Sequence, residues 1–269
     1  AFGNGNMAQV DITNTVQTQE VTVTKKWLDT FEGEEDYWNL RPEDVKVTLT
    51  GMADGKLAED ASCEVTLEKD SWSAARQVRT HDAKGNPITY TVSEAPVTRY
   101  DFIAEQSTTE IMPANGETDV QVTNSLRLLG GDGELTVTKI WDDKGGSESD
   151  RPKVSFKLLY ADGSPVTAKG QELIAELDKN DTAVFKNVPA NADGYIVEEI
   201  VDGASNTGRY VCEQQDNRVR VTAGEKTAEF TNTRTMAVVT VTKTIVDETI
   251  DSEACLLYTS PSPRDRQKS

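Results

Sequence analysis

The sequence predicts an all-β protein made of tandem β-sandwich domains, and three observations support this prediction. Runs of 5 to 8 residues rich in Val, Thr, Tyr and Ile alternate polar and apolar side chains, which is typical of half-buried strands. Clusters of Gly, Asn, Asp and Pro separate the runs, such as DAKGNP at 82–87 and ADGSP at 161–165, and they favour turns. The third observation is a long internal repeat, since roughly 100 residues of short strands make one two-sheet sandwich.

Two short motifs define the repeat. One reads VTVTKKWLD, LTVTKIWDD and VTVTKTIVD from residues 21, 135 and 239, so its copies are 114 and 104 residues apart. The other contains an Asn in the strings DITNT, QVTNS and EFTNT, and these residues are Asn14, Asn124 and Asn232. Self-similarity at a fixed period indicates tandem structural units.

Four expected strands occur in the same order in both copies, at 21–29, 41–49, 88–96 and 120–125 in the first and at 135–143, 151–159, 194–202 and 228–233 in the second. Further strands are expected at 63–67 and at 210–212. Residues 170–178 are an exception whose spacing also suits a short helix. We therefore expect complete units at 18–127 and 132–235, joined by a short linker at 128–134. Residues 1–17 would end a preceding unit, and residues 236–254 would begin a further one.

The C-terminal segment 255–269 does not fit the repeat. It begins CLLYTSPSPRD, the string that a translated transposase-type sequencing adapter yields, and we interpret it as a non-native tail in preference to a natural Pro/Ser-rich one. The tail has three basic residues and one acidic residue, so the net charge of −18 for the whole chain becomes −20 for residues 1–254.

Composition excludes several classes of protein. The 46 acidic and 28 basic residues are scattered singly, which argues against nucleic-acid binding because phosphate contacts need a basic surface. No apolar stretch is long enough to span a membrane, and residues 1–10 resemble no signal peptide. The cysteines Cys63, Cys212 and Cys255 cannot form a disulfide framework. Because Cys63 and Cys212 lie on apolar strand faces, we expect small buried residues there.

Three kinds of polar residue fall on strand faces that are otherwise apolar. Counting alternate positions places Lys25 with Val21 and Val23, because side chains alternate across a strand. The same count places further polar residues on the inward faces. They are Glu94 and Asn124 in the first unit, and Lys139, Glu199 and Asn232 in the second. The count selects Glu199 over its neighbour Glu198.

Burial of these residues has two interpretations. A Lys–Glu ion pair hydrogen-bonded to Asn explains it without chemistry. Alternatively, burial favours a neutral amine, which is a nucleophile, and a protonated carboxyl, which donates a proton. A carboxamide beside them can lose ammonia. Together they would supply the reactants and the catalyst for an amide bond between side chains.

The motifs VTKxW, RPxxVxxxL, YxVxE and (V/F)TN(S/T), in this order, resemble the Cna B-type domains, the B-type repeats of Gram-positive collagen adhesins and pilins. This resemblance implies an Ig-like, prealbumin-like sandwich in which a first-strand Lys and a last-strand Asn form an isopeptide bond assisted by an acid. Carried over, the triads are Lys25, Glu94 and Asn124, then Lys139, Glu199 and Asn232. Asn14 and Lys243 are isolated members of incomplete triads, and Ile245 replaces the Trp of the other copies.

The resemblance further implies stalk or spacer repeats of an extracellular, cell-wall-anchored protein. The partners would be neighbouring repeats of the same chain and, in the alternative function, a host extracellular-matrix protein. No cofactor or metal is expected, and no enzymatic turnover beyond the single bond-forming event in each unit.

Competing functions depend on particular residues. The segment Asp29–Leu40 contains Phe31, Tyr37 and Trp38 among acidic residues. It suits either a recognition loop or, as we favour, a solvated insertion packed on its own sandwich. Neither the acidic residues of segment 29–40 nor those of the second unit have the spacing of an EF-hand, so we favour solvated loops over calcium sites. The acidic residues of the second unit are Asp142, Asp143, Glu148 and Asp150. His81, the single histidine, lies in a turn-like segment outside any hydrolase motif, and we expect it to be exposed and idle.

Overall fold

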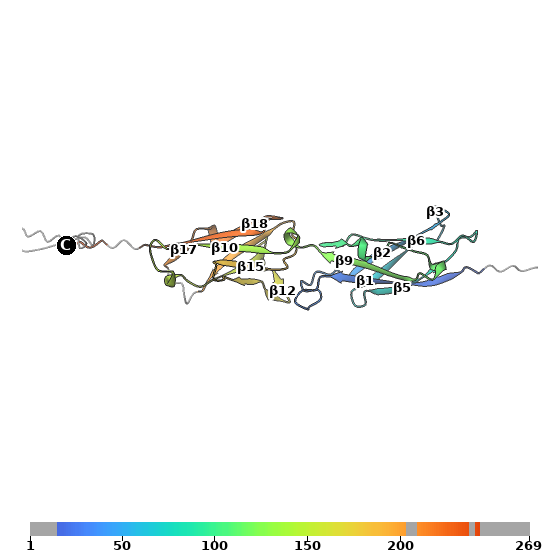
Figure 1. The fold of residues 1–269 in the computed structure, drawn as a ribbon, viewed down its shortest axis with the longest axis horizontal. Helices are drawn as coiled ribbons and strands as arrows, with labels where there is room; N and C mark the ends of the chain where they lie inside the picture. Colours follow the sequence, from blue (N-terminus) through green and yellow to red (C-terminus); the bar gives the residue numbers. More distant parts are fainter. Residues whose placement is uncertain (1–14, 203–208, 237–239, 243–269) are drawn as a thin grey trace, which may run out of the picture. The chain divides into compact units, whose positions relative to one another are not determined.

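The structure is a computed structural model that describes residues 15–202, 209–236 and 240–242. These residues form two successive β-sandwiches (Figure 1), which confirms the predicted all-β class. The strands of the first sandwich are β1 (Thr18–Leu28), β2 (Asp44–Ala53), β3 (Lys56–Leu57), β4 (Cys63–Glu68), β5 (Ser73–Arg79), β6 (Thr89–Glu94), β7 (Tyr100–Phe102), β8 (Glu110–Ile111) and β9 (Asp119–Leu126).

The second sandwich repeats the plan with minor additions. Its strands are β10 (Leu135–Asp142), β11 (Val154–Tyr160), β12 (Thr167–Ala168), β13 (Gln171–Glu172), β14 (Ile174–Glu176), β15 (Thr182–Phe185), β16 (Tyr195–Val201), β17 (Tyr210–Cys212), β18 (Arg218–Val221) and β19 (Thr227–Arg234). Short 3-10 turns occur at Ala104–Gln106, Pro113–Asn115, Leu129–Gly131, Glu148–Asp150 and Gln215–Asn217. The segment 170–178 contains β13 and β14, so the suggestion of a helix there was wrong.

Each sandwich pairs one sheet built on its first and last strands with a second sheet. In the first sandwich the sheet order is β5-β1-β9-β7, and the facing sheet has the order β3-β2-β6-β8 with β4 also paired to β2. In the second sandwich the orders are β15-β10-β19-β17 and β14-β11-β16-β18, with β12 and β13 as a separate pair. The two units therefore share one topology, as their repeated motifs indicated.

The first and last strands of each unit are parallel neighbours. β1 pairs with β9 and β10 pairs with β19, in both cases with the strands running in the same direction. Parallel neighbours need a long crossover connection, and here the rest of the sandwich provides it. This pairing brings residues far apart in sequence onto adjacent strands.

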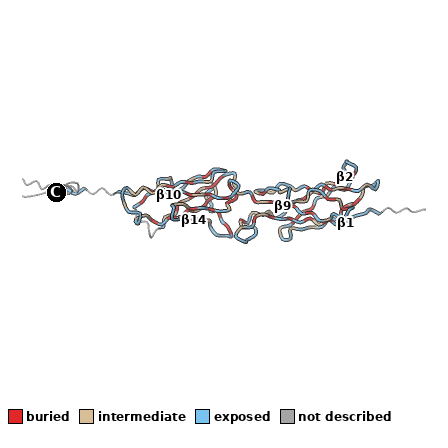
Figure 2. The backbone as a smooth tube through the Cα atoms, in the orientation of Figure 1, coloured by how far each residue is buried: buried red, intermediate tan, exposed pale blue. Residues whose placement is uncertain are grey.

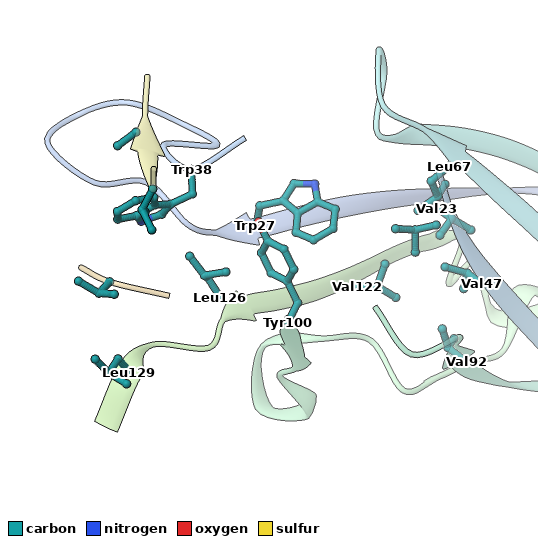
Figure 3. Packing of buried hydrophobic residues seen from close by; sticks show 14 of the residues in the cluster. Val23, Trp27, Trp38, Val47, Leu67, Val92, Tyr100, Val122, Leu126 and Leu129 are labelled. Atoms are coloured by element: carbon teal, nitrogen blue, oxygen red, sulfur yellow. The ribbon is translucent and has the colours of Figure 1, made fainter. Parts of the chain in front are cut away.

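The core is made of the inward side chains of both sheets. Buried and exposed stretches alternate along the strands (Figure 2), because successive side chains of a strand point to opposite faces. In the first unit Val23 of β1 and Val122 of β9 face Val47 and Val92 of the other sheet (Figure 3). The valine and threonine repeats of the sequence thus provide an apolar inner row and a polar outer row.

The linker is held by backbone hydrogen bonds. Leu129 is buried, and its N–H donates to the carbonyl oxygen of Val188 at 2.9 Å. Gly133 has φ +74°, and a Cβ there would lie 2.9 Å from the Asn187 backbone. Glycine is required at this position both for its dihedral angle and for this close approach.

Parts of two predicted segments cannot be compared with the structure. Asn14 and Lys243 lie outside the described residues, as does all of the tail 255–269. Within the described part of 236–254, Met236 and residues 240–242 are not in a strand. No helix in the described ranges is long and apolar enough to cross a membrane.

Candidate functional site

Lys25, Glu94 and Asn124 meet inside the first sandwich. Lys25 Nζ donates to Glu94 Oε2 at 2.5 Å, and Asn124 Nδ2 donates to Glu94 Oε1 at 2.6 Å. The parallel register places Lys25 opposite Val122 and Asn124 opposite Trp27, one inward position apart on neighbouring strands. Glu94 ends β6 of the facing sheet. The triad therefore spans both sheets.

Lys139, Glu199 and Asn232 form the corresponding group in the second sandwich. Lys139 Nζ lies 3.1 Å from Glu199 Oε1, and Asn232 Nδ2 donates to the same oxygen at 2.8 Å. Asn232 stands opposite Trp141 in the parallel pair β10–β19, which is the register of the first unit. The same topology therefore produces two similar triads.

Both triads are closed to solvent. The side chains of Lys25 and Glu94 are 0% and 2% exposed, and those of Lys139 and Glu199 are both 0% exposed. Burial lowers the pKa of Lys25 and of Lys139 below the ordinary value of 10.5, and the neighbouring glutamate only partly opposes this effect. A lowered lysine pKa favours the neutral, nucleophilic amine.

Several triad atoms lack a hydrogen-bond partner within the described residues. They are Asn124 Oδ1, Asn232 Oδ1, Glu199 Oε2 and Lys139 Nζ. Lys139 Nζ nevertheless lies 3.1 Å from Glu199 Oε1 as an ion pair. Buried polar atoms are usually paired, and an unpaired one costs free energy. The clusters are thus incompletely satisfied as purely structural networks.

The arrangement suits an acyl transfer between side chains. A proton shared between the lysine amine and the glutamate can reside on the carboxylate, which leaves a neutral amine beside the Asn carboxamide. Attack of lysine Nζ on Asn Cγ would form a new C–N bond, and cleavage of the Cγ–Nδ2 bond would release ammonia. The glutamate contacts both nitrogen atoms whose protons must move.

Glu198 is not part of this site. Its carboxylate accepts hydrogen bonds from Arg218 Nε at 2.9 Å and Nη2 at 2.7 Å, and the Arg218 side chain is 43% exposed. Glu199, one residue later, points to the opposite face of β16 and is buried. The structure places the two adjacent acids as the alternation of the strand requires.

The aromatic side chains of segment 29–40 pack against the hydrophobic core. Trp38 is only 6% exposed and belongs to the hydrophobic core, while Lys169 Nζ lies 5.0 Å from the centre of the Tyr37 ring. Phe31 is also packed against the core. The segment is therefore packed, as the favoured interpretation expected, and its glutamates are exposed.

The acidic residues of the second unit are engaged by basic side chains. Asp142 contacts Lys144, Asp143 and Glu148 contact Arg151, and Asp150 contacts Arg209 and Arg234. Across the described ranges, no group of three or more His, Cys, Asp or Glu side chains is arranged to hold a metal ion.

The remaining singled-out residues have structural surroundings. His81 is half-buried rather than exposed, and its Nδ1 lies 2.9 Å from the Thr80 hydroxyl. Cys63 and Cys212 are half-buried free thiols rather than fully buried residues. Cys212 stands opposite Asn232 in the β17–β19 pair, beside the second triad.

One group beside each triad was absent from the sequence prediction. In the first unit it consists of Asp29, Arg41 and Tyr100, which meet beside Trp27. The sequence carried a signal for it, since Lys25, Trp27 and Asp29 continue one inward face at alternate positions. The repeated Trp, Asp and Arg-Pro residues identify the repeat in the sequence, but the sequence pattern predicts no structural role for them.

The sequence matches the family described as the Cna protein B-type domain over residues 21–125 and 135–233. These ranges coincide with the two sandwiches. The chain is also 29% identical over 216 residues to a collagen adhesin of Staphylococcus aureus. That alignment covers 80% of this chain but 16% of the adhesin, so the chain spans a small part of its relative.

Solved structures resemble the chain at low sequence identity. Two B repeat units (B1B2) of the collagen binding protein Cna of Staphylococcus aureus share 23% identity, with a TM-score of 0.35 and coverage of 81% of this chain and 50% of that one. The shaft pilin SpaA of Lactobacillus rhamnosus GG shares 16% identity, with a TM-score of 0.33 and coverage of 83% of this chain and 100% of that one.

Proposed function

Because the chain belongs to the family of Cna protein B-type domains, we propose that it forms stalk repeats of a bacterial cell-surface adhesin or pilin, locked by internal isopeptide bonds. The observation that carries the proposal is the glutamate in each core that contacts both a lysine amine and an asparagine carboxamide. Residues 18–127 and 132–235 would be the two complete repeats. The protein would act outside the cell, at the cell wall.

Each bond would form once, without a cofactor. Lys25 Nζ would attack Asn124 Cγ, and Lys139 Nζ would attack Asn232 Cγ, each releasing one ammonia molecule. Glu94 and Glu199 would take the proton that the amine loses and supply one to the departing nitrogen. The reaction consumes only side chains of the chain itself, so each unit turns over a single time.

The position of the bond suits a load-bearing spacer. β1 enters the first sandwich and β9 leaves it, and the bond would join these parallel neighbours near the same end. A pull on the two ends would then run along β1 to Lys25, across the bond, and out through Asn124. Residues 26–123 would carry no load, so force could not peel the sheets apart.

The charge and cysteine content suit the same role. The net charge of −18 keeps neighbouring chains apart in solution. An amide bond, unlike a disulfide, is not broken by reducing agents. The alternative of a matrix-binding module gains no support from segment 29–40, because Trp38 is buried.

Intact-mass spectrometry of the purified full chain tests the proposal. We expect a mass lower than the sequence mass by two ammonia molecules, and branched tryptic peptides that link Lys25 to Asn124 and Lys139 to Asn232. A Lys25→Met chain should be lighter by one ammonia only, with the second branched peptide retained. A wild-type chain of unmodified mass would reduce both triads to buried hydrogen-bonded clusters.

A further inference from the structure

Each sandwich contains an Asp–Arg–Tyr cluster that the bond-forming chemistry does not use, with a buried aspartate in the first unit and a half-buried one in the second. In the first unit, Arg41 Nε donates to Asp29 Oδ2 at 2.9 Å and Arg41 Nη2 donates to Asp29 Oδ1 at 2.6 Å. The Tyr100 hydroxyl donates to Asp29 Oδ2 at 2.8 Å. Asp29 is 1% exposed. One carboxylate thus ties β7 and the chain segment after β1 to the end of β1.

The second unit builds the same cluster from its own residues. Arg151 donates to Asp143 through Nε at 3.2 Å and Nη2 at 2.7 Å, and the Tyr210 hydroxyl donates to Asp143 Oδ1 at 2.6 Å. Hydrogen bonding to Arg151 and Tyr210 lowers the pKa of Asp143, so its charge is retained at neutral pH. Two sandwiches of different sequence therefore arrive at one arrangement.

A tryptophan connects each cluster to its triad. The centre of the Trp27 ring lies 4.7 Å from Lys25 Nζ and 5.6 Å from Arg41 Cζ. Trp141 lies 5.0 Å from Lys139 Nζ and 5.5 Å from Arg151 Cζ. The ring is therefore shared by the reactive lysine and the clamped arginine.

Tyrosine and arginine both contact this ring. Trp27 makes an edge contact with Tyr100, with the ring centres 4.8 Å apart (Figure 3), and Trp141 does so with Tyr210 at 5.4 Å. A bidentate arginine–carboxylate pair is geometrically specific. An aspartate that also binds the tyrosine therefore sets two neighbours of the tryptophan ring at once, beside the contact of Trp27 with Trp72 at 4.9 Å and the hydrogen bond from Trp141 Nε1 to Asp181 at 3.1 Å.

We propose that Arg41 and Arg151 are positioning residues for isopeptide formation, which hold Trp27 and Trp141 against the lysine amines through the Asp–Arg–Tyr clusters. This inference rests on the proposed function. A ring held against Nζ excludes water, and exclusion of water favours the neutral amine and carboxylic acid over the ion pair. Without the clamp the ring loses its tyrosine and arginine contacts, water can then reach the amine, and the fraction of unreactive ammonium rises.

The test compares both units within one chain. The full chain carrying Arg41→Gln is made by cell-free synthesis, quenched in denaturant at timed intervals and digested, and each branched peptide is quantified. We expect the Lys25–Asn124 bond to form about tenfold more slowly. Water that reaches Lys25 would raise its pKa by about one unit, and this lowers the fraction of neutral amine about tenfold. The Lys139–Asn232 bond should form at its wild-type rate. Arg41→Lys, which keeps a cation for Asp29 and the ring, should recover part of the lost rate.

A purely structural role predicts a different result. If Arg41 only stabilises the fold, its replacement would lower the denaturant midpoint of unfolding without slowing bond formation in molecules that remain folded. The folded fraction is therefore measured separately, in a chain that also carries Glu94→Gln and does not react. Wild-type kinetics in a folded Arg41→Gln chain would overturn the inference.

The mirrored variant Arg151→Gln repeats the test at a more exposed arginine, with the first unit as control. It covers the case in which Arg41→Gln does not fold, and wild-type kinetics in folded Arg151→Gln would also overturn the inference. A wild-type chain that forms neither bond would instead contradict the proposed function itself.

Discussion

The two sandwiches hold the same residue types in the same register but use their glutamates differently. In the first unit Glu94 Oε2 accepts from Lys25 and Oε1 accepts from Asn124. In the second unit Glu199 Oε1 lies close to both partners, and Oε2 has no hydrogen bond within the described residues. A carboxyl group with one oxygen for each reactant can accept a proton on one side while it delivers a proton on the other. If both bonds form as proposed, we expect the first to form faster, because Glu94 engages each reactant with its own oxygen.

The largest expected effect comes from removing one acid at a time. Glu94→Gln should abolish or greatly slow the first bond, because an amide keeps the shape of the side chain but cannot relay the proton. The second bond should still form, which leaves a chain one ammonia lighter than its sequence mass. Glu199→Gln should give the reciprocal result by peptide mapping.

Glu198→Gln is the matched control, since Glu198 lies one residue from Glu199 but is bound to Arg218 on the surface. Two ammonia losses at normal speed in Glu94→Gln would show that the acid role is wrong. Loss of the second bond in Glu198→Gln would contradict the assignment of Glu199.

Removal of either bond should cost similar stability in the two units. The bonded residues are 99 positions apart in the first unit (124 minus 25) and 93 apart in the second (232 minus 139). A covalent link over such a loop stabilises the folded state by about 4 to 5 kcal/mol, on the chain-entropy estimate for a disulfide. Hydrogen exchange monitored by mass spectrometry, compared between wild type and the single glutamate variants, gives the change for each unit. A cost confined to one unit would mean that only that unit is bonded.

The rates of the two reactions should differ in the wild-type chain. We expect the first bond to form roughly fivefold faster, which corresponds to the ~1 kcal/mol of one well-aligned hydrogen bond that Lys139 lacks. Timed quenching after synthesis, with both branched peptides measured in the same samples, gives the ratio directly. Equal rates, or a faster second bond, would contradict the link between carboxylate geometry and speed.

The smallest effect concerns the thiol beside the second triad. Burial, reinforced by the neighbouring Glu199, raises the pKa of Cys212 from 9.0 to about 11. Because the thiolate is the reactive form, alkylation of folded protein should keep accelerating as the pH rises past 9 and level off only near 11. A Cys63→Ser/Cys255→Ser chain isolates this thiol, and the same chain unfolded in denaturant should level off near 9. A folded-state plateau at 9 would show that the thiol is more solvated than its position indicates.

The sequence determined much of the fold because its signals were local and repeated. Alternation in VTVTKKW and LTVTKIW gave the inward face of β1 and β10, and the same count separated Glu198 from Glu199. The residues that surround each triad could not be predicted from this alternation. The contact of Asp29 with Arg41 and Tyr100 depends on how a loop and a distant strand pack, and the burial of Trp38 depends on how the loop itself folds. The alternation of side chains along a strand predicts which face a strand residue points to, but it does not predict where a loop residue lies.

The parallel pairing of the first and last strands has a topological consequence once the bonds form. With the proposed bonds in place, residues 25–124 would be one closed covalent ring and residues 139–232 another, with the chain entering and leaving each ring at neighbouring strands. A protease that cuts once inside a ring opens it without separating its pieces. Only the short stretches outside the rings, such as residues 125–138, are points where a single cut severs the molecule. With both bonds formed, a single cut in an exposed loop between the strands would therefore leave the protein in one piece.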